Sequence, residues 1–112
     1  MNFYDKVHEL VRNFKDTEEY KKYMELKKKV KEDADLKEKI DTFRNKQMDY
    51  QKQYINGVPM SDSSKEEMQQ LYSLIIQSPL GAEFFQAEIR LNVLLADMQK
   101  IINDGVKDVL EF

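Results

Sequence analysis

The residue types that most often do chemistry are scarce in this chain. It has one histidine, His8, and no cysteine. A catalytic histidine works with a nucleophile and an orienting group, whereas His8 has only Glu9 beside it on an amphipathic segment. One histidine without thiolates also provides no set of ligands for zinc or iron. We therefore interpret His8 as a surface residue and expect no catalytic residue, no cofactor and no metal site.

Carboxylates are abundant, but their spacing is typical of helix starts. Asp35 and Glu38 are three residues apart, which is the spacing of a capping box at a helix N-terminus. Acid–base catalysis would need buried carboxylates that face each other. Di-metal helical bundles use Glu-x-x-His motifs, which this sequence lacks. The carboxylates therefore predict capped, solvated helix faces in a protein that is not an enzyme.

One basic run could contact phosphate groups. It consists of four lysines that lie close together: Lys27, Lys28, Lys29 and Lys31. Each lysine would add a salt-dependent contribution to RNA binding. Glu25 and Glu32 bracket the run, so ion pairs along a helix explain it as well. RNA contact through this face therefore stands as the alternative function.

Length and composition indicate one all-helical domain over residues 1–112. Charged residues make up 35% of the chain, and 3 glycines and 2 prolines are too few for the turns of an all-β fold. Residues 1–54 carry 14 Lys/Arg and 12 Asp/Glu, a net charge of +2, whereas residues 55–112 carry 4 and 9, a net charge of −5. Neither half has the strongly basic character of a nucleic-acid-binding domain, so we do not expect nucleic acid as the main partner.

The sequence gives no sign of a membrane segment. No apolar run approaches the about 20 residues that span a bilayer, and the N-terminus lacks the apolar core of a signal peptide. The polar face of the last third is acidic, with Glu83, Glu88 and Asp97, whereas helices that lie on membranes have basic faces. We therefore expect a cytoplasmic protein.

Hydrophobic periodicity and cap residues predict five helices. They cover residues 3–14, 17–32, 35–56, 63–77 and 79–103, with the last one ending near Gly105 or continuing beyond it. The third and fifth are expected to be the longest and to pack antiparallel as a helical hairpin. Phe43, Leu91 and Leu94 occupy the centres of their apolar stripes, so we expect them in the buried core.

The last third of the chain has more apolar surface than so small a protein can cover. Two adjacent apolar lines run along Ser78 to Phe112, and the second contains Leu95, Ile102, Val106 and Val109. Contiguous exposed apolar patches usually mark interfaces, and two-fold homodimers are the commonest closed assembly. We therefore expect a homodimer that completes the helical bundle, with these four residues as the candidate interface.

Three segments resemble a known family. They are NFYDKVHEL at residues 2–10, FRNKQMDYQKQYINGVPMS at 43–61 and AEIRLNVLLADMQKIINDGVKDVLEF at 87–112. The chain resembles the YlbF/YmcA-like family of small bacterial helical proteins, closest to its YheA-like branch. The most specific piece is Phe43-Arg44 followed by Gln47, Gln51 and the turn at Gly57.

The resemblance implies an all-helical cytoplasmic protein that self-associates through its helices. Relatives assemble with partner proteins and modulate an RNA-cleaving enzyme without known catalysis of their own. Some relatives have cysteines associated with an iron–sulfur cluster, which this cysteine-free chain does not share. We therefore expect a non-enzymatic interaction or regulatory protein that is linked to the control of RNA processing through unidentified partner proteins. The alternative is an RNA-associated factor that contacts RNA through Lys27 to Lys31.

Overall fold

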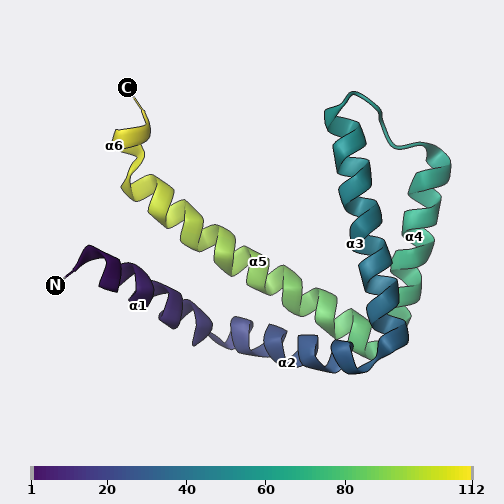
Figure 1. Cartoon of the computed structure of the whole chain (residues 1–112), viewed down its shortest axis with the longest axis horizontal. Coiled ribbons are helices and arrows are strands. Elements are labelled where there is room, and N and C mark those ends of the chain that lie inside the picture. The colour runs from purple at the N-terminus through teal and green to yellow at the C-terminus, as the bar shows by residue number, and fades with distance from the viewer. Residues whose placement is uncertain (1, 112) are drawn as a thin grey trace. The chain divides into compact units, whose positions relative to one another are not determined.

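The computed structural model describes residues 2–111, and helices make up most of them. The elements are α1 (Phe3–Lys15), α2 (Glu18–Glu32), α3 (Ala34–Ile55), α4 (Asp62–Gln77), α5 (Pro79–Gly105) and α6 (Lys107–Leu110) (Figure 1). No strand occurs within this described range. The all-helical prediction is therefore confirmed, and five of the elements match the predicted helices to within one or two residues.

Side-chain caps explain where most of the helices begin. Asn2 Oδ1 accepts a hydrogen bond from the Tyr4 backbone N–H at 2.8 Å, and Ser78 Oγ accepts one from the Gly81 backbone N–H at 3.2 Å. The cap of α3 is Asp33, whose Oδ1 accepts from Leu36 N–H at 3.1 Å. The predicted cap, Asp35, lies instead inside the first turn, where it contacts Lys39 at 2.9 Å.

The chain divides into two compact units. Unit 1 combines Met1–Glu25 with Gln86–Phe112, and unit 2 is the continuous segment Leu26–Phe85. The boundaries between the units fall inside two helices. The helix α2 begins in unit 1 and ends in unit 2, and α5 begins in unit 2 and continues into unit 1. The expectation of a single domain over residues 1–112 stays a prediction.

Unit 2 is built around a helical hairpin of α3 and α4 (Figure 1). The loop between them turns at Gly57, whose φ of 83° lies in the left-handed region that glycine adopts without strain. The sequence predicted α5 as the antiparallel partner of α3. That choice was wrong, because α4 packs along α3, and α5 contributes only its start, up to Phe85, to this unit.

The core of unit 2 brings together apolar side chains from all four of its helical segments. Its buried members are Leu26, Val30, Leu36, Ile40, Ile75, Phe84 and Phe85. Phe43 was predicted to belong to this core, but it is only half-buried. Its ring packs against those of Tyr72 and Phe85, at centroid distances of 5.9 Å each, so it lies at the edge of the core rather than in its centre.

The corner between α4 and α5 needs a glycine. A Cβ atom built on Gly81 would lie 2.2 Å from the backbone oxygen of Ile75, which is closer than such atoms approach in real structures. Ile75 itself is fully buried. The corner therefore brings the last turn of α4 and the first turn of α5 into direct backbone proximity.

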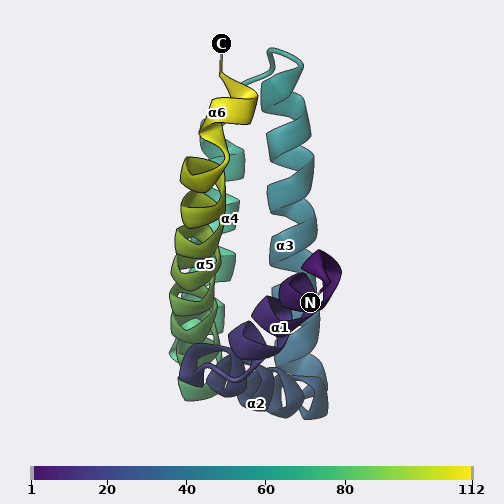
Figure 2. The ribbon, with the colours of Figure 1, turned by 90° about the vertical axis from the view of Figure 1, so that its left-hand side faces the viewer.

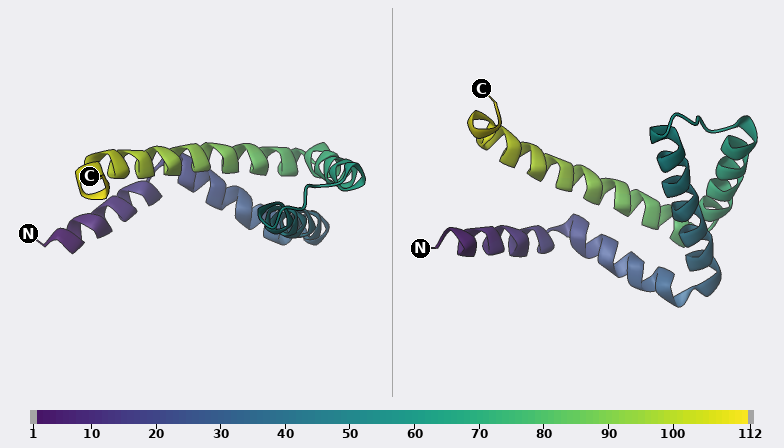
Figure 3. Two further views of the ribbon diagram at one scale, coloured as in Figure 1. Left: turned by 90° about the horizontal axis from the view of Figure 1, so that it is seen from above. Right: turned by 45° about the horizontal axis from the view of Figure 1, so that its top comes forward.

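Unit 1 contains α1, the beginning of α2 and most of α5 with α6. A break at Asp16–Thr17 separates α1 from α2, whereas α5 continues as one helix (Figure 3). The helix α5 ends at Gly105, and the short α6 follows after Val106 (Figure 2). Leu91 and Leu94 were predicted to be buried, but in unit 1 they are half-buried.

Candidate functional site

The helix α1 exposes its whole apolar stripe. Its sequence places large hydrophobic residues at three- and four-residue steps, which is the pattern of a helix that packs on a partner. None of its residues is buried. The exposed fractions along this stripe are Phe3 73%, Tyr4 68%, Val7 42%, Leu10 39% and Val11 45%.

The end of α5 adds a second exposed apolar line to unit 1. Ile101 is 72% exposed and Ile102 is 44% exposed, and beyond them Val106 and Val109 expose 43% and 80%. Three of the four candidate interface residues are thus on the surface, while Leu95 is half-buried. Beyond Gly105, Val106 and Val109 stay exposed.

An open apolar groove lies between α1 and α5 within unit 1. It has a volume of about 340 Å³, and its apolar lining includes Leu10, Phe14, Leu94, Met98 and Ile102. Its polar groups come from Asn13, Thr17 and Asp97. Such a groove can receive apolar side chains of another helix, and it contains no set of groups that could activate a substrate.

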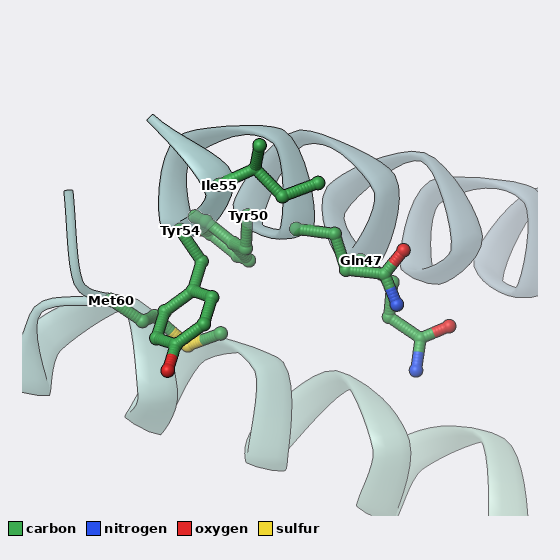
Figure 4. Close-up of a pocket in the computed structure, with 6 residues that line it drawn as sticks. Gln47, Tyr50, Tyr54, Ile55 and Met60 are labelled. Carbon is green, nitrogen blue, oxygen red and sulfur yellow. The ribbon is translucent and has the colours of Figure 1, made fainter. Parts of the chain in front are cut away.

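A second open pocket lies at the loop end of the hairpin in unit 2. It has a volume of about 450 Å³ and is lined by Gln47, Tyr50, Gln51, Tyr54, Ile55 and Met60 (Figure 4). Tyr54 extends from α3 toward the chain segment that carries Met60. Tyr54 and Ile55 are 74% and 81% exposed, so this pocket belongs to the surface of the hairpin.

The basic run lies on α2 beside the core of unit 2. Leu26 and Val30 are buried, so the face of α2 that carries them packs into the core and the lysines between them lie toward the other side of the helix. Lys27 is half-buried, whereas Lys28, Lys29 and Lys31 are exposed. RNA contact through this run stays a prediction.

The polar chemistry of the described residues is that of a solvated helical surface. His8 is exposed on α1. Among residues 2–111 no three His, Asp or Glu side chains gather as a metal site would need. The hydrogen bond from Lys46 Nζ to Glu67, 2.6 Å long, joins α3 to α4 and raises the pKa of Lys46 above its usual value.

Two features of these surfaces were missed in the sequence. The spacing of its apolar residues gives α1 an apolar face, but whether that face is exposed depends on which helices cover it. The hairpin pocket was signalled only by the heptad-like spacing of Gln47, Tyr50 and Tyr54, which continues to the end of α3. Such spacing defines a face, whereas a pocket also needs the neighbouring helix and loop.

Within the described residues, no helix is both long and apolar enough to cross a membrane. The exposed hydrophobic residues are distributed among the charged residues of amphipathic helices.

Comparison with known proteins identifies relatives over nearly the whole chain. The family model described as "Control of competence regulator ComK, YlbF/YmcA" matches residues 3–107. A UPF0342 protein of Halothermothrix orenii is 35% identical over 107 residues, which cover 96% of this chain and 91% of that protein. A UPF0342 protein of Symbiobacterium thermophilum is 33% identical over 109 residues, 97% of each chain.

A third relative, a UPF0342 protein of Shouchella clausii, is 32% identical over 108 residues, covering 96% of this chain and 92% of that protein. The matched range includes the apolar stripe of α1, the hairpin and the whole of α5. A closer relation to the YheA-like branch stays a prediction. The family match and the relatives agree on one assignment: this chain belongs to the YlbF/YmcA family.

Proposed function

We propose that this chain is a non-enzymatic regulatory protein that acts through protein contacts, the first of them with a second copy of itself. The description of its family names control of a competence regulator, and we propose regulation of that kind, in the cytoplasm, for this chain. The observation that carries the proposal is the apolar surface of unit 1. We define it as Phe3, Tyr4, Val7, Leu10, Val11, Ile101, Ile102, Val106 and Val109.

The size of the unit 1 apolar surface supports a second copy as its occupant. Given the about 150–250 Å² of an aromatic side chain and less for the aliphatic ones, the exposed fractions correspond to on the order of 900 Å². A stable complex buries about 800 Å² on each partner. The surface is therefore large enough for a two-fold interface in which it meets its own copy.

The four candidate interface residues have different roles in this proposal. Ile102, Val106 and Val109 are exposed and available to a partner. Leu95 is half-buried in unit 1, so we expect it to support the surface more than to contact the second copy. The α1 stripe joins these residues in a surface that the sequence had placed on the last third of the chain alone.

The first prediction concerns Ile102→Asp. A charge placed at the centre of an apolar interface is desolvated without a partner, so we expect the dimer dissociation constant to rise about 100-fold. Ile102 is 44% exposed, so the monomer should keep its helical circular dichroism spectrum. Analytical ultracentrifugation at micromolar concentration is the measurement, with wild type at twice the 13.4 kDa chain mass.

Val93→Asp is the matched control. Val93 is 56% exposed and lies about two and a half turns from Ile102, on the opposite side of α5. This variant should remain dimeric. A wild-type chain that stays at the monomer mass at every concentration, or two variants that dissociate alike, would contradict self-association through this surface.

The regulatory part of the proposal is tested in the native cell. Replacing the gene by the Ile102→Asp form should change the level of the competence regulator, and the Val93→Asp form should not. If deleting the gene leaves that level unchanged, this regulatory role is excluded, whatever the state of assembly.

A further inference from the structure

We propose that the groove between α1 and α5 of unit 1 is filled by the Phe3 ring of a second copy, with the two α1 helices antiparallel across a two-fold axis. This inference rests on the proposed function, because it requires that the unit 1 apolar surface mediates self-association. It deepens that function by naming the parts that meet. The groove of each copy and the exposed start of the other copy's α1 then complete each other twice in every dimer.

The apolar face of α1 becomes more exposed toward the start of the helix. Phe3, Val7, Leu10 and Phe14 follow one another at steps of three or four residues, so they share one face. Phe14 is half-buried and Leu10 is 39% exposed, whereas Phe3 is 73% exposed. The end of this face near Phe14 lines the groove with α5, while the first turn keeps the Phe3 ring in solvent.

The first turn of α1 is ordered, so Phe3 projects from a regular helix. The Tyr4 N–H donates to Asn2 Oδ1 at 2.8 Å, which caps the helix immediately before Phe3. The Phe3 ring packs edge to face against the Tyr4 ring, with the two centroids 5.6 Å apart. A partner that covers Phe3 does not have to order this backbone first, which lowers the free-energy cost of binding.

The groove has the size and the lining that an aromatic ring requires. Its volume is about 340 Å³, and an apolar cavity of about 150 Å³ is enough to bind benzene. Leu10 and Phe14 line it from α1, and Leu94, Met98 and Ile101 line it from α5. The thioether of a methionine also makes favourable contacts with aromatic rings. A phenyl ring in this groove would therefore be surrounded by apolar groups.

Phe3 cannot reach the groove of its own chain while α1 remains a helix. Leu10 is the groove residue nearest to Phe3 along α1, and it lies about 10 Å away along the helix axis. Because both residues belong to the same rigid helix, turning Phe3 back into the groove would unwind about two turns of α1. The ring that fills the groove therefore comes from a second copy.

A two-fold axis near the middle of α1 brings each Phe3 ring to the groove of the other copy. When a helix packs antiparallel on its own copy, residues at equal distances on either side of the axis lie opposite each other. Phe3 then lies opposite the stretch from Leu10 to Phe14 if the axis crosses α1 near Val7 and His8. Two parallel α1 helices would instead place Phe3 against Phe3 and leave both grooves empty.

This pairing places no charged residue of α1 at its centre. The charged residues of the helix are Asp5, Lys6, Glu9, Arg12 and Lys15. At about 100° per residue, each of them points at least roughly 70° away from the middle of the face that carries Phe3 and Phe14. Asp97 is the charged residue of the groove lining, and it is exposed at the rim. The rings can therefore be buried without removing these charges from water.

The first test measures the dimer dissociation constant by analytical ultracentrifugation. Phe3→Ala should raise this constant about tenfold or more, as expected for an aromatic anchor in a pocket. Ile101→Ala shortens an exposed groove residue and should raise it severalfold. In the double variant the rise should be smaller than the product of the two single effects, because the two side chains lose one shared contact.

Ile89→Ala is the matched control, because Ile89 is 61% exposed on the unit 1 part of α5 but does not line the groove. It should leave the dissociation constant unchanged, alone or combined with Phe3→Ala. Circular dichroism checks that each variant is helical, and Phe3→Leu replaces Phe3→Ala if the latter loses helix. An unchanged constant for the Phe3 variant, or independent effects of Phe3→Ala and Ile101→Ala, would overturn the proposal.

The second test determines the direction of the two helices by disulfide formation in this cysteine-free chain. A tagged Phe3→Cys chain is mixed with an untagged Leu10→Cys or Phe14→Cys chain and mildly oxidised. We expect mixed disulfides, identified by their mass on a non-reducing gel, and none with an untagged Ile89→Cys chain. Links that form only between two Phe3→Cys chains would show parallel helices and contradict the proposal.

These results separate this inference from the proposed function. If wild type is a dimer that Ile102→Asp dissociates and Phe3→Ala does not weaken, the copies meet through other parts of the unit 1 apolar surface. The proposed function then stands and this inference is wrong. If wild type stays monomeric at every concentration, both are wrong.

Discussion

Individual side chains differ in burial even where the hydrophobic periodicity of the sequence places them on the same helix face. Ile75 and Ile76 are neighbours on α4, but Ile75 is fully buried and Ile76 is 39% exposed. The periodicity of α4 assigned both to its apolar face, because a helical stripe indicates a direction and not a depth. Phe43 shows the same limit, since it lies on the predicted face but only at the edge of the core.

We expect Ile75→Ala to lower the free energy of unfolding by about 2–5 kcal/mol, because it removes a fully packed side chain and leaves a cavity. Ile76→Ala removes the same atoms from a partly exposed position and should cost about 1 kcal/mol. Urea denaturation of the two variants measures the difference. Equal losses would mean that the two isoleucines are buried alike and that the packing of α4 described here is wrong.

At the scale of the elements, the helix boundaries were the most predictable feature, because hydrogen bonds between residues close in the sequence decide them. Asn2, Ser78 and the turn at Asn56–Gly57 have the roles that their residue types predict. Asp33 was missed as a cap because Asp35 with Glu38 also forms a capping pattern, and only the backbone conformation decides between them. The pairing of α3 with α4 could not be read from periodicity, since several helices offer compatible apolar faces.

Replacing glycine by alanine is expected to have opposite effects on stability at the corner between α4 and α5 and at the end of α5. Gly81→Ala should destabilise the protein by about 1–3 kcal/mol, because its Cβ would meet the Ile75 backbone and force the corner apart. Gly105→Ala meets nothing within 4 Å and should stabilise the helix by about 0.5–1 kcal/mol. Thermal unfolding of both variants is the measurement. A neutral Gly81→Ala variant would show that the two helices do not approach so closely.

At the scale of the whole molecule, the sequence predicted the class of fold and the presence of excess apolar surface. It placed that surface on the last third of the chain alone, where Ile102 at the end of α5 and Val106 and Val109 beyond it are exposed. The share contributed by α1 was not predicted, because exposure depends on the positions of all neighbouring helices. The hairpin pocket could not be foreseen for the same reason, since Met60 and Tyr54 meet only after the chain has turned at Gly57.

The central claim is that the unit 1 apolar surface is covered by a second copy. The cysteine-free chain allows a direct test, in which a single thiol introduced by Ile102→Cys or Val93→Cys reacts with a soluble maleimide. The two positions are similarly exposed in the described chain, at 44% and 56%. We expect Ile102→Cys to react at least about tenfold more slowly at high protein concentration, and the two rates to converge on dilution as the dimer dissociates. Equal rates at every concentration, or slower reaction of Val93→Cys, would contradict the claim.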